Sequence, residues 1–190
     1  MGIILASASP RRRELLEMLA IGDFQVIPAA GEEKTTAETP EERVKEIALG
    51  KGLEVAEKCS KDDIVIAADT LVHFNGIDLG KPKDEEDALS MLMMLSGETH
   101  TVYTGVAVLK DDMVDVRVQA TEVTFVNFTE KEALGYIATK EPMDKAGAYG
   151  AQGKGAVLVH GIKGDFFNVM GLPICLLSDM LKNIGIHVFE

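Results

Sequence analysis

The sequence predicts an α/β fold, and three observations carry this prediction. A short apolar run at 3–6 is followed at Ser9-Pro10 by a strong helix start, which indicates a strand, a tight polar turn and a helix. A second apolar run, at 64–68, is typical of a strand covered on both faces. Two long segments, 98–109 and 113–128, alternate in polarity like an antiparallel hairpin. These elements together favour a central mixed, twisted β-sheet flanked by helices.

The composition restricts the partners that this chain can have. Its 190 residues suffice for one domain over 1–190, and 46% are apolar. The net charge of −12 repels nucleic acid and anionic membranes, so any phosphate site must be a local pocket. We found no run of about 20 apolar residues and no charged leader, and we expect a cytoplasmic location with reduced cysteines. The four histidines lack metal-ligand spacing, so we expect structural roles for them.

The first helix carries unusual charges. Residues 11–13 are all arginine, at the helix end where the dipole disfavours cations. The helix starts at Thr39 and Thr129 instead have an acidic residue three positions after the cap. Arginines beside free N–H groups favour a phosphate site. The alternative is that they are solvated or pair with Glu14 and Glu17, and charge and spacing alone leave both open.

A long helix is predicted from Pro40 to about Cys59, after a strand at 24–27 and a polar loop. Lys51 falls on its apolar face. The ammonium either extends to the rim of that face or reaches an anion in a cleft. Gly50 and Gly52 flank it, and glycine weakens a helix by about 1 kcal/mol relative to alanine. A kink or a closely packed neighbour would account for them.

The strand at 64–68 ends in Asp69 and Thr70. An acid at such a strand end is where α/β folds place ligand chemistry, although it can also cap a turn. We expect a hairpin over 71–79 next, because Asn75-Gly76 is a strong turn signal. A helix from about 84 to 95 follows the hairpin.

The segment 141–155 is rich in glycine and follows a predicted helix at 129–140. It is not a Walker loop, because the spacing fails and Gly155 stands where Ser or Thr is needed. The glycine density still suggests backbone that passes close to a ligand. We expect a strand at 156–159 after it and a last helix at about 173–183.

Five ordered motifs resemble those of a known family. They are Ala6-Ser7-Ala8-Ser9-Pro10-Arg11-Arg12, Ala68-Asp69-Thr70, Gly80-Lys81-Pro82, Lys145-Ala146-Gly147-Ala148-Tyr149-Gly150-Ala151-Gln152-Gly153 and Gly171-Leu172-Pro173. At matching intervals over almost the whole chain, they make it similar to the Maf proteins, which are nucleoside triphosphate pyrophosphatases. The resemblance implies a Maf/inosine triphosphatase-like fold with two lobes around a cleft.

The resemblance also implies an activity. Maf proteins hydrolyse a nucleoside triphosphate to the monophosphate and pyrophosphate with a divalent cation, Mg²⁺ or Mn²⁺. Asp69 would be the general base and a metal ligand, and Glu33 is the next candidate carboxylate. Arg11, Thr70 and Gln152 match the group that acts on dTTP and UTP. The sister group has Gln in place of Thr70 and Glu in place of Gln152.

Six of the predicted substrate contacts lie in the same motifs, and the seventh, Lys51, comes from the predicted helix at 40–59. The full set is Ser7, Arg11, Arg12, Lys51, Thr70, Lys81 and Gln152. A second hypothesis is a nucleotide-binding regulator of cell division without significant catalysis, since the family has been associated with septum formation. A homodimer is also expected, from the frequency of symmetric oligomers and from family analogy.

Overall fold

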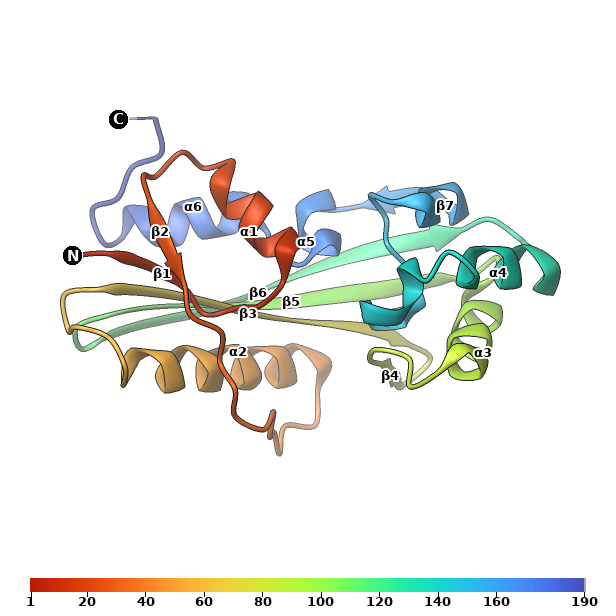
Figure 1. Cartoon of the computed structure of the whole chain (residues 1–190), viewed down its shortest axis with the longest axis horizontal. Helices are drawn as coiled ribbons and strands as arrows, with labels where there is room; N and C mark the ends of the chain where they lie inside the picture. The colour runs from red at the N-terminus through yellow and green to blue at the C-terminus, as the bar shows by residue number, and fades with distance from the viewer. Residues whose placement is uncertain (190) are drawn as a thin grey trace. The chain divides into compact units, whose positions relative to one another are not determined.

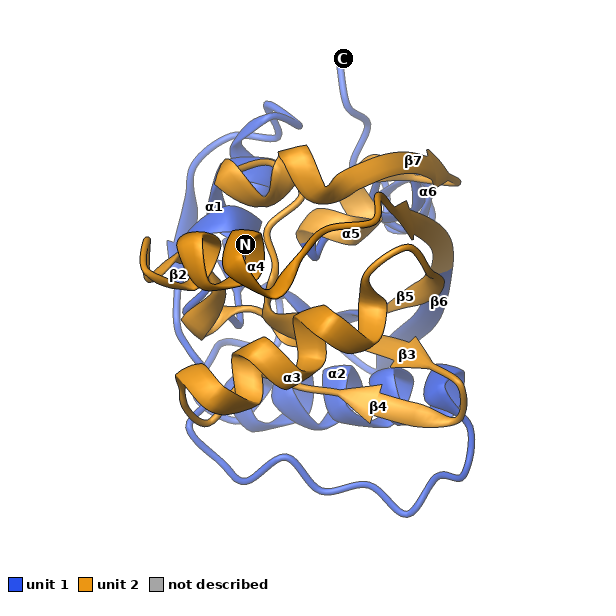
Figure 2. Ribbon diagram, turned by 90° about the vertical axis from the view of Figure 1, so that its right-hand side faces the viewer, with its two compact units in different colours: residues 1–69, 104–119, 171–190 blue, residues 70–103, 120–170 orange. Residues whose placement is uncertain are grey.

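The computed structural model describes residues 1–189 and contains a mixed sheet of seven strands flanked by helices (Figure 1). The strand order is β2-β1-β3-β5-β6-β7, and β4 pairs with β3. The chain divides into two compact units, shown in blue and orange in Figure 2. Unit 1 contains residues 1–69, 104–119 and the chain from 171 onward, and unit 2 contains 70–103 and 120–170. The predicted α/β class with a mixed sheet is confirmed.

Parallel strands in unit 1 set the position of the candidate residues. Strand β1 lies between β2 and β3, with Leu5 opposite Val26 on one side and Ile66 on the other. Residues that follow these three therefore lie toward the same edge, where α/β proteins place ligand chemistry. The strands are β1 (Ile3–Leu5), β2 (Phe24–Val26) and β3 (Ile64–Phe74).

Three helices of unit 1 cover the two faces of this sheet. Helix α2 lies on one face, and α1 and α6 lie on the other (Figure 1). Ser9 and Thr39 cap α1 and α2 as predicted, and proline occupies the first turn of each helix. The bounds are α1 (Pro10–Glu17), α2 (Pro40–Ala56) and α6 (Ile174–Lys182).

Helix α2 packs closely against the neighbouring strand β5 (Thr99–Lys110). A Cβ on Gly52 would lie 2.6 Å from Leu109 Cδ1, and one on Gly105 would collide with the backbone carbonyl of Val44. No atom lies within 4 Å of the corresponding position on Gly50. Gly52 therefore marks close packing, and α2 continues past both glycines as one helix.

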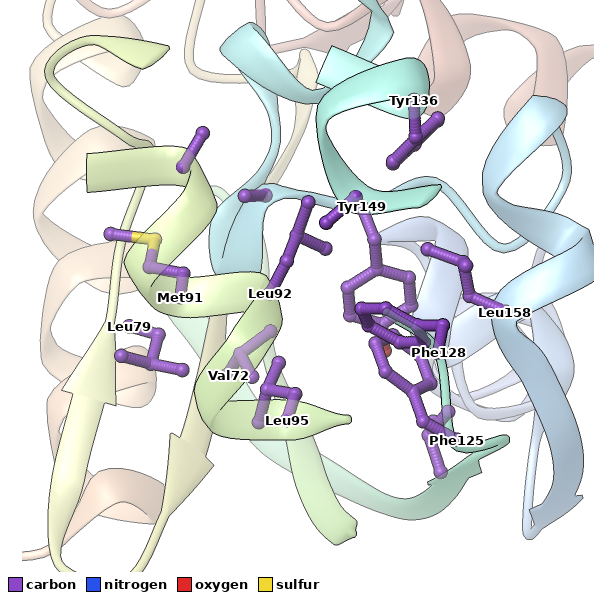
Figure 3. Close-up of a cluster of buried hydrophobic side chains, with 14 of the residues drawn as sticks. Val72, Leu79, Met91, Leu92, Leu95, Phe125, Phe128, Tyr136, Tyr149 and Leu158 are labelled. Atoms are coloured by element: carbon purple, nitrogen blue, oxygen red, sulfur yellow. The ribbon is translucent and has the colours of Figure 1, made fainter. Parts of the chain in front are cut away.

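Unit 2 is built around a different core (Figure 3). Leu92 and Leu95 of α3 pack there with Phe125 and Tyr149, whose ring centroids are 4.7 Å apart. The elements of this unit, besides parts of β3, β5 and β6 (Met113–Phe125), are β4 (Ile77–Leu79), α3 (Glu85–Leu95), α4 (Glu130–Ile137), three 3-10 helices (Glu141–Asp144, Ala146–Ala148 and Lys154–Leu158), β7 (Val159–Lys163) and α5 (Phe166–Met170).

His100 lies inside this second core and is only 2% exposed. Its Nε2 is 2.8 Å from the Tyr149 hydroxyl, while its Nδ1 has no hydrogen-bond partner. Burial lowers the pKa of His100 to about 4, since the charged imidazolium loses its hydration there. This placement fits the structural role predicted for the histidines.

Two sequence predictions of local structure differ from the structure. Strand β3 runs without interruption through Asp69 and Thr70, where we expected a strand end and a new hairpin strand. The expected strand at 156–159 is wrong, because a 3-10 helix continues to Leu158 and β7 starts only at Val159. In the described part of the chain, no helix combines the length and apolar character needed to cross a membrane.

Candidate active site

The turn between β1 and α1 orients Arg12. Its Nε donates to the carbonyl of Gly171 at 2.8 Å, and its Nη1 donates to the Ser7 hydroxyl at 3.3 Å. Ser7 is 7% exposed and also accepts from the backbone N–H of Ser9. Arg13 differs from Arg12, because it is exposed and pairs with Glu17 at 3.0 Å. Of the two interpretations of the arginines, pairing along the helix therefore describes Arg13, whereas Arg12 turns back toward the end of β1.

Lys51 lies between two carboxylates. Its Nζ is 2.7 Å from Asp69 Oδ1 and 2.7 Å from Glu33 Oε1. The side chains of Lys51 and Asp69 are 19% and 13% exposed, whereas Glu33 is 56% exposed. The question left open by the sequence is thus answered: the ammonium does not extend into solvent alone but is held by two acids. The three residues come from α2, β3 and the loop after β2.

The loop that carries Glu33 is anchored to α2. Glu54 accepts hydrogen bonds from the backbone N–H groups of Ala30 at 3.0 Å and Gly31 at 2.9 Å. The Ala30 amide, the side chain of Lys58 and the Gly31 amide hold the pKa of Glu54 at about 2. Glu54 lies three residues after Lys51, so the two side chains share one face of α2. Glu54 bonds the backbone of the loop, and Lys51 pairs with Glu33 from the same loop. Sequence reasoning missed Glu54, and only its spacing from Lys51 could have indicated it.

Arg12 interacts through its charge with Asp69 and Glu33, the two acids that contact Lys51. Burial lowers the pKa of Arg12, and the charges of Asp69 and Glu33 oppose that shift while Arg11 adds to it. The sequence-predicted residues of unit 1 therefore form one group near the ends of the parallel strands β1 and β2. They are Ser7, Arg11, Arg12, Glu33, Lys51 and Asp69.

Unit 2 contains the other three predicted residues, Thr70, Lys81 and Gln152. Thr70 follows Asp69 on β3 and is half-buried, while Lys81 and Gln152 are exposed. The carbonyl of Gly80 accepts from the N–H of Gly147 at 3.0 Å, which ties the Lys81 segment to the glycine-rich segment.

Three glycines near Gln152 approach side chains of the protein itself. A Cβ on Gly153 would lie 2.5 Å from both carboxylate oxygens of Glu141, and one on Gly155 would lie 2.5 Å from the Tyr136 hydroxyl. One on Gly150 would lie 2.8 Å from Lys145 Cε and 3.2 Å from the same carboxylate. The described contacts thus explain these glycines by Glu141, Tyr136 and Lys145, where the sequence suggested a ligand. Glu141 and Tyr136 carried no motif signal of their own.

No cluster of three or more His, Cys, Asp or Glu side chains suited to a metal ion occurs within residues 1–189. Glu33 and Asp69 nevertheless contact one cation, the ammonium of Lys51, from two sides. Mg²⁺ is commonly held by one or two carboxylates together with waters and substrate phosphates. The pair therefore fits a divalent cation that binds with a phosphate substrate.

The fold and this cluster define an α/β protein in which Lys51 contacts a carboxylate on β3 and Arg12 lies within the influence of its charge, beside the ends of the parallel strands β1 and β2. A family model described as "Maf-like protein" matches residues 2–184, and the chain belongs to this family. Among its relatives are proteins named "dTTP/UTP pyrophosphatase" from Bacillus cereus (strain ZK / E33L) and Bacillus thuringiensis subsp. konkukian (strain 97-27). Each is 49% identical over 187 residues, which cover 98% of this chain and 97% of the relative.

Solved structures of low sequence identity share the fold. The Ham1 protein of Staphylococcus aureus matches with a TM-score of 0.55 at 18% identity, over 97% of this chain and 100% of that protein. A HAM1 protein from Coxiella burnetii matches with a TM-score of 0.55 at 16% identity, over 96% of this chain and 99% of that one. These two similarities concern the fold alone.

Proposed function

We propose that this protein is a nucleoside triphosphate pyrophosphatase that hydrolyses dTTP and UTP to the nucleoside monophosphate and pyrophosphate. The observation that carries the proposal is Lys51, whose ammonium lies 2.7 Å from both Glu33 and Asp69. Membership of the Maf-like family and the names of relatives at 49% identity support the reaction and the two nucleotides.

The cations bind the triphosphate in this proposal. A triphosphate carries several negative charges, which Arg11, Arg12, Lys51 and Lys81 neutralise and orient. The Ser7 hydroxyl adds a hydrogen bond at the turn before α1. When phosphate oxygens arrive, Lys51 exchanges part of its contact with the two carboxylates for the new anion. The ion pairs of the free protein therefore keep Lys51 in place before substrate binds.

Glu33 and Asp69 would hold the divalent cation, Mg²⁺ or Mn²⁺. When bound, the cation supplies charge neutralisation to the phosphate oxygens and to the leaving pyrophosphate. Glu33 comes from the loop anchored by Glu54, so that loop also sets the position of one proposed ligand.

Asp69 is the proposed general base. Its carboxylate accepts a proton from a water molecule whose oxygen forms a new bond to the α-phosphorus. The bond between that phosphorus and the bridging oxygen breaks in line with the attack, and pyrophosphate leaves with the electron pair. Lys51 holds Oδ1 of Asp69, which fixes the orientation of the carboxylate toward the water.

Gln152 and Thr70 are the proposed contacts to the base. The Gln152 amide offers one donor group and one acceptor, which complement the O4 and N3–H edge of uracil and thymine. Its exposed side chain is available for such a contact. Thr70 adds a hydroxyl contact from the strand that carries Asp69.

A panel of nucleoside triphosphates tests the proposal. The protein is incubated with each nucleotide and Mg²⁺ or Mn²⁺, with and without a chelator, and pyrophosphate and monophosphate are measured. We expect release from dTTP and UTP that stops when the cation is removed. Tight binding without product would instead favour the regulator of cell division, and release of orthophosphate would contradict the reaction.

A cytoplasmic location and a homodimer complete the proposal. Cys59 and Cys175 are both free thiols, which suits a reducing compartment. Light scattering of the purified protein determines the oligomeric state.

A further inference from the structure

The loop 150–155 is built around one carboxylate. Glu141 Oε1 accepts from the N–H of Gly155 at 3.1 Å and from the Tyr136 hydroxyl at 2.9 Å. Its Oε2 accepts from the N–H of Lys154 at 2.9 Å. The Tyr136 hydroxyl in turn accepts from the N–H of Gly150 at 3.0 Å. Both ends of the loop are thus bonded to a connected pair of side chains.

The pKa shifts of Glu141 and Tyr136 show which group donates and which accepts in this hydrogen-bond network. Burial tends to raise the pKa of Glu141, but the amides of Lys154 and Gly155 and the Tyr136 hydroxyl lower it below its usual value. Burial raises the pKa of Tyr136, so its hydroxyl stays protonated and donates a hydrogen bond to Glu141. Hydrogen bonds to an ionised acceptor are about twice as strong as neutral ones. The loop is therefore held by strong, directed bonds.

We propose that Glu141 and Tyr136 are positioning residues that fix Gln152 for recognition of the pyrimidine base. This inference rests on the proposed function, because it assigns a specificity role to the same loop. Gln152 lies between the anchored positions 150 and 154, and only Ala151 and Gly153 separate it from them. Its side chain is exposed, whereas the side chains that hold its backbone are half-buried, at Glu141, and buried, at Tyr136.

Such anchoring matters most for discrimination between uracil and cytosine. The two bases differ at the edge that Gln152 is proposed to read: uracil has an O4 acceptor and an N3–H donor, and cytosine reverses both. Bonds at 150 and 154 fix the backbone that carries Gln152, so its amide reaches the base from one position and one order of donor and acceptor is favoured. A mobile loop would let the amide approach either base. Pre-organisation therefore supplies selectivity as well as affinity.

The experiment compares Tyr136→Phe and Glu141→Gln with the wild type, using UTP and CTP as substrates. We expect the ratio of kcat/KM for UTP over CTP to fall about tenfold, or about 1.4 kcal/mol, mainly through a higher KM for UTP. Inhibition by inorganic triphosphate should not change, because that anion has no base. Amide hydrogen exchange at 150–155 should become faster in both variants.

Glu132→Gln is the matched control. Glu132 also accepts a backbone N–H, that of Thr129 at 2.7 Å at the start of α4, but it has no bond to the loop. This variant should be less stable and keep the wild-type UTP to CTP ratio. In a Glu141→Gln background, Gln152→Ala should reduce that ratio less than it does in the wild type, since the amide is already misplaced.

The outcomes separate this inference from the function on which it rests. A wild-type ratio in both Tyr136→Phe and Glu141→Gln overturns the positioning role, whether or not exchange at 150–155 becomes faster. The phenylalanine variant keeps the test valid if the Glu141 variant does not fold. Absence of pyrophosphate release from UTP by the wild type overturns the proposed function itself, and faster exchange would then report only a structural anchor.

Discussion

The two units hold their candidate residues by different means. In unit 1, Arg12, Lys51 and Asp69 stand on two helices and a strand. Hydrogen bonds join the Arg12 side chain to its neighbours, and an ion pair joins Lys51 to Asp69. In unit 2, Gln152 stands on an irregular loop whose backbone is bonded to buried or half-buried side chains. The first arrangement fixes charges through regular elements, and the second anchors the main chain on either side of one amide side chain.

This difference matches the two tasks in the proposed reaction. Every nucleoside triphosphate presents the same charged tail, and regular elements suit a fixed pattern of charge. The base is the part that varies between nucleotides, and loops accept sequence changes more readily than helices and strands do. If the comparison holds, substitutions in unit 1 should abolish chemistry or folding, and substitutions around Gln152 should redirect specificity.

The largest expected effect is that of Asp69→Asn. An amide cannot accept the proton from water, so turnover should fall by about 10³-fold, within the range for a general base. Binding of dTTP should persist, because the cations remain. Pyrophosphate release and calorimetric binding measure the two quantities. Near-normal turnover would remove Asp69 from the role of base and break the division of tasks between the units.

Substitution of two glycines in unit 1 tests how closely its regular elements, α2 and β5, are packed together. Gly105→Ala should lower the free energy of unfolding by about 3 kcal/mol, because the added methyl group meets the backbone of Val44 and neither can move easily. Gly50→Ala is the control and should raise it by up to about 1 kcal/mol, since that position is open and helical. Chemical denaturation measures both. Equal effects would mean that α2 is not held closely against β5.

Acid sensitivity of unit 2 is the smallest expected effect. The pKa of His100 is lowered from 6.5 to about 4 in the folded protein, so between these values the unfolded chain binds more protons. Folding stability should therefore fall as the pH decreases through this window, by about 2–3 kcal/mol from this residue, and level off below pH 4. Unfolding measured against pH in the wild type and in His100→Gln isolates the contribution. A slope that is unchanged in the variant would contradict it.

Much of unit 1 could be predicted because its signals are local. Capping residues placed the starts of α1 and α2, and helical spacing put Lys51 on the face of α2 that lies toward the sheet. The nature of its partners could not be predicted, since Glu33 and Asp69 are 18 residues away on either side. Only the tertiary fold brings them to one ammonium.

The glycine-rich segment shows the opposite case. Its composition suggested that the backbone passes close to a ligand, whereas the described contacts of these glycines are with side chains of the protein itself. Glu141 belongs to the same segment and has no neighbours that mark it as an anchor. Its role depends on a 3-10 turn and on Tyr136 from α4, and local propensity specifies neither. A strand was predicted at 156–159 for the same reason, where the 3-10 helix continues to Leu158.

The bond from Arg12 to the carbonyl of Gly171 has a consequence for biosynthesis. The ribosome makes residue 12 early and residue 171 much later, so a nascent chain carries its arginines long before their acceptor exists. Unit 1 likewise cannot complete its fold until α6 has been synthesised, because α6 is part of that unit. A prematurely terminated product would therefore lack the bond that joins Arg12 to the last segment of unit 1.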